Sequence, residues 1–159
     1  MPGFKSVFVS SLTEVTTVAK DQLGDIRWEG NKVYKYVQYK EEAAAVDGVA
    51  GEVCYYVLDT GFGAHQVTSD LSASGGAGAE IGAGVLQAVM SDNEFGWIQI
   101  KGLAVLTITL TAGADGNALT PQGSADGTLD VVVTTVALGH ICAYITDVTD
   151  KEILCDFPF

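Results

Sequence analysis

The chain has 159 residues, and its 8 basic and 20 acidic residues give it a formal net charge of −12. Nucleic-acid binders neutralise phosphates with Lys and Arg, and the sequence has a single arginine, Arg27. This balance excludes direct binding of DNA or RNA, and attraction to an anionic membrane surface fails for the same reason. Since 48% of the residues are apolar and 18% are charged, we expect the acidic excess to keep a mostly apolar protein in solution.

The three cysteines, Cys54, Cys142 and Cys155, form no close pair and no Cys/His metal motif. The first residues, MPGFKSVFVSS, contain no long apolar run, so we expect no secretory signal. From both observations we expect that the chain is made in a cytoplasmic compartment and that its thiols are reduced there. The longest apolar runs are too short to span a bilayer.

Apolar residues alternate with polar ones along most of the chain, which predicts strands. Residues 4–10 fit a strand or an extended arm, and helical character is confined to 13–22 and 40–46. Gly102 separates two of the predicted strands, and residues 112–127 are predicted to form a long loop. The predicted strands cover residues 24–29, 32–39, 52–58, 85–90, 97–101, 103–111, 129–138 and 140–146.

About eight short strands joined by turns predict an all-β fold, either a single β-barrel or a β-sandwich. We place this domain at residues 23–159, and an N-terminal arm or edge segment at residues 1–22, with extended segments at both ends. The expected core consists of the inward-facing members of the alternating pattern: Ile26, Val33, Val37, Val53, Val57, Val89, Ile98, Ile100, Leu106, Ile108, Leu110, Val131, Val133, Ile141 and Ile145.

The sequence EFGWIQIKG, residues 94–102, is the most informative stretch. Trp97, Gln99 and Lys101 share one face of the predicted strand, and Ile98 and Ile100 share the other. The face with Ile98 and Ile100 is expected to pack against the core. An indole beside an amide and an ammonium group indicates a half-buried surface that meets a partner. The alternative is an ordinary sheet strand with a tryptophan at its boundary.

Both ends of the sequence carry aromatic side chains, although free termini are usually mobile and polar. Aromatic ends indicate docking, either on the chain's own barrel or on a neighbouring subunit. Together with the half-buried face of the tryptophan strand, they give a set of expected interface residues: Phe4, Phe8, Trp97, Gln99, Lys101, Phe157 and Phe159.

No group of side chains in the sequence predicts catalysis. His140 and Cys142 share a strand face, but residues i and i+2 lie roughly 6.5–7 Å apart at their Cα atoms, and no third partner is evident. The glycine-rich residues 75–84 fail the spacing of a phosphate-binding loop. Residues 115–117 and Asp126 resemble calcium-loop fragments without the remaining ligands. We therefore expect no enzymatic activity, no cofactor and no metal.

Three segments and their order resemble the capsid decoration, or cement, proteins of tailed bacteriophages. These are LGDIRWEGNKVYKYVQY (residues 23–39), GEVCYYV (51–57) and EFGWIQIKG (94–102), followed by a glycine-rich segment. The resemblance covers residues 23–145, and the first 22 residues and the last dozen have no counterpart in it. Its motifs are short and none of them is catalytic.

The resemblance implies a structural virion protein that binds the outer surface of the assembled capsid and clamps neighbouring major capsid proteins. Its partners would be the major capsid protein and itself, as a homotrimer, with neither nucleic acid nor membrane. It would be made in the host cytoplasm. The alternative is a carbohydrate-binding or adhesion β-sandwich on a virion or cell surface, with Trp28, Trp97 or Tyr36 as stacking platforms. A small β-barrel enzyme would need a pocket around His140 or the Asp residues.

Overall fold

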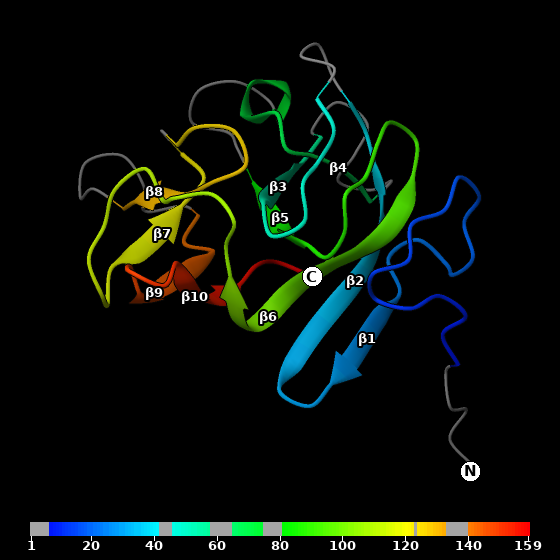
Figure 1. Cartoon of the computed structure of the whole chain (residues 1–159), viewed down its shortest axis with the longest axis horizontal. Helices are drawn as coiled ribbons and strands as arrows, with labels where there is room; N and C mark the ends of the chain where they lie inside the picture. Colours follow the sequence, from blue (N-terminus) through cyan, green and yellow to red (C-terminus); the bar gives the residue numbers. More distant parts are fainter. Residues whose placement is uncertain (1–6, 42–45, 58–64, 75–80, 123, 133–139) are drawn as a thin grey trace.

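The computed structural model describes residues 7–41, 46–57, 65–74, 81–122, 124–132 and 140–159. Within these ranges the chain has no α-helix and one short 3-10 helix, η1 (Leu71–Ser74). The strands form one sheet (Figure 1). They are β1 (Ile26–Glu29), β2 (Lys32–Tyr39), β3 (Val53–Tyr56), β4 (Gln66–Thr68), β5 (Gly82–Leu86), β6 (Phe95–Val105), β7 (Ala118–Thr120), β8 (Asp130–Val131), β9 (Ala143–Asp147) and β10 (Glu152–Asp156).

Five of these strands close into a mixed barrel in the order β2-β4-β3-β5-β6, because β6 pairs back onto β2. The β2–β4 pair is parallel, and the other pairs of the barrel are antiparallel. The other five strands lie outside it: β1 extends from β2, and β10, β9, β7 and β8 continue from β6 (Figure 1). The all-β prediction is confirmed, and of its two alternatives the chain forms the barrel.

Strand β6 belongs to both the barrel and the outer sheet. Its first part pairs with β2, and its last part pairs with β10. The strand passes through Gly102, which has a φ of 89°. A Cβ atom at this position would lie 2.7 Å from the carbonyl oxygen of Asn31, in the turn between β1 and β2. The predicted break at Gly102 is therefore wrong, since the glycine lets the strand continue past a close backbone.

The glycine-rich segment before Val85 also contributes a barrel strand. The predicted strand 85–90 is shifted, and β5 covers Gly82–Leu86 instead. A Cβ atom at Gly84 would lie 2.8 Å from the carbonyl oxygen of Gln99 on β6. Small residues are needed here because two backbones approach closely.

Other element boundaries also differ from the prediction. Strand structure in residues 103–111 ends at Val105, the expected loop 112–127 contains β7, and the tail contains β10. Residues 13–22 form no helix, and Thr16 makes an isolated bridge to Phe95. Of the predicted strand 129–138 the described part holds only β8, and residues 133–139 lie outside the described ranges, as do residues 42–45.

The main core fills the barrel and continues under β10 and β9. Of the predicted core, Val33, Val37, Val53, Val57, Ile98, Ile100, Leu106, Leu110 and Ile145 are buried. Ile26, Ile108 and Val131 are partly buried, and Val133 lies outside the described residues. Val89 and Ile141 are exposed, so these two predictions are wrong. Each lies just outside a strand, where the period of two no longer applies, and the neighbouring Met90 and Cys142 are the buried residues.

Candidate interaction surface

The outer face of β6 is divided into two parts. Its even-numbered residues Ile98, Ile100 and Ala104 point into the main core, so the odd-numbered residues lie on the outer face. At the start of β6 that face packs against residues 7–22, and we call this region the covered half. At the end of β6, Leu103 and Val105 are exposed, and we call this region the open half.

Trp97 is the centre of the covered half, and it is 1% exposed. The ring of Phe8 meets the indole edge-on, with 5.3 Å between the ring centres, and the centre of the Tyr36 ring lies 5.1 Å from that of Trp97. Its indole Nε1 donates a hydrogen bond of 2.9 Å to Ser10 Oγ. The half-buried surface predicted for Trp97 is therefore wrong, because the N-terminal segment of the same chain lies over it.

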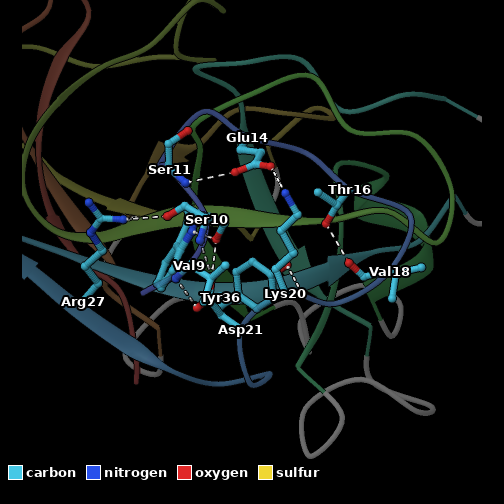
Figure 2. Close-up of polar contacts among 11 residues, drawn as sticks. Val9, Ser10, Ser11, Glu14, Thr16, Val18, Lys20, Asp21, Arg27 and Tyr36 are labelled. Carbon is cyan, nitrogen blue, oxygen red and sulfur yellow. Dashed lines mark hydrogen bonds and ion pairs between the residues drawn. The ribbon is translucent and has the colours of Figure 1, made fainter. Parts of the chain in front are cut away.

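Asp21 anchors that segment through its carboxylate (Figure 2). It accepts hydrogen bonds from the backbone N–H groups of Val9, at 2.9 Å, and Ser10, at 3.1 Å, and also from the Ser10 hydroxyl. Burial disfavours the charged carboxylate, but the hydrogen bonds from Ser10 and Val9, with the charge of Arg27, outweigh it and lower the pKa of Asp21. The carboxylate is thus charged at neutral pH and holds the segment against β6.

Arg27, the only arginine of the sequence, is engaged within the covered half. Its Nη1 donates to the carbonyl oxygen of Ser10 at 2.9 Å, and its Nη2 pairs with Glu29. The guanidinium carbon lies 5.6 Å from the centre of the Phe8 ring and 5.7 Å from that of Trp97. The chain's strongest anion-binding side chain therefore stabilises its own N-terminal segment.

Gln99 and Lys101 lie between the two halves. The half-buried surface predicted for Gln99 is also wrong, since the residue is buried and its Nε2 donates to the carbonyl oxygens of Lys101 at 3.1 Å and Leu103 at 2.9 Å. Lys101 forms an ion pair with Asp156, and its Nζ lies 5.3 Å from the centre of the Phe159 ring. Gln99 thus supports the backbone, and Lys101 borders the open half.

The aromatic residues near the ends occupy different environments. Phe157 is buried in the main core, and its N–H donates to the carbonyl oxygen of Ile100 at 3.1 Å. Phe159 is exposed, and Phe8 is partly buried on Trp97. Phe4 lies outside the described residues. The expected interface residues therefore do not form one surface, and their part in binding a partner stays a prediction.

The open half carries a row of apolar side chains that crosses four strands. Leu103 on β6 lies opposite Leu154 on β10, which lies opposite Tyr144 on β9, which lies opposite Ala118 on β7. Residues directly opposite each other in neighbouring strands point to the same face. Leu103, Leu154 and Tyr144 are 37%, 42% and 40% exposed. We call these four residues the apolar row.

Polar side chains flank the apolar row on both sides. The ion pair between Lys101 and Asp156 lies on one side. On the other side Glu152 lies opposite the exposed Val105 and accepts a 2.8 Å hydrogen bond from Thr146 Oγ1. Asp147 is paired with Glu152 across the strands. Lys151, which precedes Glu152, donates from its Nζ to the carbonyl oxygen of Thr107 at 2.8 Å. Of the three carboxylates on the flanks, Asp156 alone forms an ion pair among the described residues.

The sequence reading did not find the apolar row, although part of its signal was present. Residues 152–157 alternate strictly, with Ile153, Cys155 and Phe157 buried and Leu154 exposed. These residues lie in the extended C-terminal segment of the prediction, beyond the last predicted strand at 140–146. The row itself depends on the order β6-β10-β9-β7, which joins segments that are distant in sequence.

The three cysteines of the chain lie within the described residues, and all of them are buried. Burial raises the pKa of all three thiols, to about 12 for Cys155, so they stay protonated at neutral pH. No three His, Cys, Asp or Glu residues among those described are placed to hold a metal ion. Within the same ranges, no helix has the length and apolar character needed to cross a membrane.

Comparisons of the chain with protein-family models, with curated proteins and with solved structures found no match.

Proposed function

We propose that this chain is a structural virion protein that binds the outer surface of an assembled phage capsid and stabilises it by clamping neighbouring major capsid proteins. The observation that carries the proposal is the apolar row, which β6 and the outer strands β10, β9 and β7 present to solvent. Exposed leucine and tyrosine side chains on a rigid sheet are suited to a lasting protein contact. The resemblance of residues 23–39, 51–57 and 94–102 to phage decoration proteins directs the choice of partner.

The proposed mechanism needs no chemical step. A protein that binds the intact shell and not its separated subunits stabilises the shell in proportion to occupancy. Many copies of a modest contact then raise the temperature at which the shell opens. The chain would be made in the host cytoplasm, where its three unpaired thiols stay reduced.

Self-association as a homotrimer is part of the same proposal. The described residues include exposed apolar side chains outside the open half, among them Val7, Val9 and Val18. Such residues favour a further contact between copies. Light scattering at high protein concentration should give three times the 16.6 kDa mass of the chain. A stable monomer, both free and on capsids, would remove the trimer from the proposal.

Co-sedimentation with capsids tests the function. Capsids from the phage that encodes the chain, prepared without it, should bind the purified protein at a fixed ratio and then release their DNA at a higher temperature. Decorated and bare capsids that open at the same temperature would contradict a cement role.

A carbohydrate-binding module is the second candidate, and Trp28 is the observation that favours it. This residue is 68% exposed on the outermost strand β1, whereas Trp97 and Tyr36 are buried. Among the three suggested stacking platforms, only Trp28 presents a ring to solvent. Oligosaccharides should then shift the tryptophan fluorescence of the native protein but not that of Trp28→Ala. An unchanged spectrum across a panel of sugars would exclude this candidate.

A further inference from the structure

The apolar row departs from the usual pattern of a one-sided sheet. In such a sheet, the face away from the core normally carries polar side chains. Here Leu103, Leu154 and Tyr144 come from three neighbouring strands and stand side by side on the outer face. Scattered exposed apolar residues need no explanation, but an adjacent set across several strands marks an interaction surface.

The covered half shows what the same chain does with apolar side chains on this face. Trp97 lies four residues before Lys101 on β6. It is buried under Phe8, and its indole N–H donates to the Ser10 hydroxyl. The open half has no comparable cover among the described residues. One face of one strand thus has an intramolecular cover at one end and an exposed apolar surface at the other.

The charges around the row indicate the chemistry of the partner. Asp156 is neutralised by Lys101, but Glu152 and Asp147 on the other flank have no basic residue paired with them in the described structure. The whole chain has a net charge of −12. A second copy placed on this face would bring acidic flanks and two strongly acidic molecules together. A partner with Lys or Arg around an apolar patch would meet opposite charge instead.

We infer that the apolar row is the docking surface of this chain, and that it takes a protein surface whose apolar centre is rimmed by basic side chains. This inference deepens the proposed function, since it rests on a structural partner and assigns the face and the chemistry of the contact. The leucines and the tyrosine provide the buried centre, and Glu152 and Asp147 attract the basic rim. Binding should therefore weaken as the salt concentration rises.

Paired lysine substitutions test the docking surface on capsids prepared without the chain. Leu154→Lys and Leu103→Lys place a charge in the row, whereas Val89→Lys places the same charge at an exposed residue outside it. We expect the row variants to bind about tenfold or more weakly, as for residues at the centre of an interface. Val89→Lys should bind like the native protein. Tyr144→Ser, which adds no charge, should also bind more weakly, and thermal melts identify any variant that fails to fold.

An independent probe separates this inference from the proposed function. Immobilised peptides of alternating Leu and Lys should retain the native protein and Val89→Lys, and retain Leu154→Lys poorly. Peptides of alternating Leu and Glu should retain none of them. If the native protein does not bind capsids, the proposed function fails. Retention on the peptides then decides by itself whether the apolar row has the inferred chemistry.

Three results would overturn the inference. The first is equal binding of the row variants and Val89→Lys to capsids, which would leave the proposed function intact. The second is equal retention of these variants on the Leu/Lys peptide. The third is a loss of the native oligomer in Leu154→Lys, measured by sedimentation velocity, because the row would then contact a second copy.

Discussion

The covered and open halves of β6 share one strand and one face, but they differ in what lies over them. Trp97 and Leu103 occupy equivalent outward positions, yet Trp97 is 1% exposed and Leu103 is 37% exposed. The difference comes from residues 7–22, which pack on the first half only. An outward position in a strand therefore does not fix exposure, because a segment distant in sequence decides it.

The two halves are also stabilised differently. In the covered half, aromatic rings pack together and one carboxylate, Asp21, satisfies two backbone N–H groups and a hydroxyl. Around the open half, the outward contacts of the described residues include the ion pair of Lys101 at its border and the hydrogen bond of Glu152. Exposed pairs of this kind contribute little to folding. We expect substitutions in the covered half to affect stability and those in the open half to affect binding.

The largest expected effect is the loss of the Trp97 side chain. Trp97→Ala should lower the free energy of unfolding by about 3–5 kcal/mol, because it leaves a cavity under Phe8 and removes the hydrogen bond from the indole N–H to Ser10 Oγ. The matched change on the open half, Leu103→Ala, should cost less than about 1 kcal/mol. Urea denaturation followed by circular dichroism measures both. Similar losses from the two variants would remove the distinction between the halves.

The junction between the halves should be the next most sensitive position. Gly102→Ala forces a Cβ to within 2.7 Å of the Asn31 carbonyl oxygen and a side chain into a φ of 89°. We expect a loss of about 1–3 kcal/mol in the free energy of unfolding. Gly116→Ala is the control, since its φ is 84° but no atom lies within 4 Å of its Cβ position. If the two variants lose equal stability, the close approach at Gly102 is unimportant.

Removal of the Ser10 hydroxyl should have a smaller effect, confined to the covered half. Ser10 Oγ donates to Asp21 and accepts from Trp97 Nε1, so Ser10→Ala leaves a buried indole N–H unpaired. A loss of roughly 1–2 kcal/mol is expected. The neighbouring exposed residue gives the control, Ser11→Ala. Hydrogen exchange at the Trp97 indole should accelerate in the first variant and not in the second.

The smallest expected effect is a pH dependence of the covered half. The pKa of Asp21 is lowered in the folded chain, so its contribution is fully present above its unfolded pKa of about 3.9. The contribution is lost as the pH falls through the lower folded value. In a Trp28→Phe background, where Trp97 is the remaining tryptophan, its emission should shift to the red below about pH 4. Asp21→Asn should abolish this step, and an identical acid transition in both proteins would contradict the assignment.

The parts of the fold predicted correctly are those that depend on local alternation. The inward positions Ile98 and Ile100 follow from the period of two, and both are buried. The cover on Trp97 does not, because Ser10 lies 87 residues away in the chain. The apolar row does not follow from local alternation either. Leu154 lies beyond the last predicted strand, and its neighbours on β6 and β9 are set by sheet order. Local pattern identified the strands, and long-range pairing determined the surfaces.

Covalent surface labelling with a photogenerated carbene, read by mass spectrometry on the free and the capsid-bound protein, tests the account most directly. In the free protein, Leu103, Leu154 and Tyr144 should be labelled and Trp97 should not. On capsids, the three residues of the apolar row should become protected, while Trp97 stays unlabelled and the exposed Val89 keeps its label. The division of β6 into a covered half and a binding half would be contradicted if the apolar row stayed labelled on capsids. It would also be contradicted if the residues that lose their label on capsids were those around 7–22.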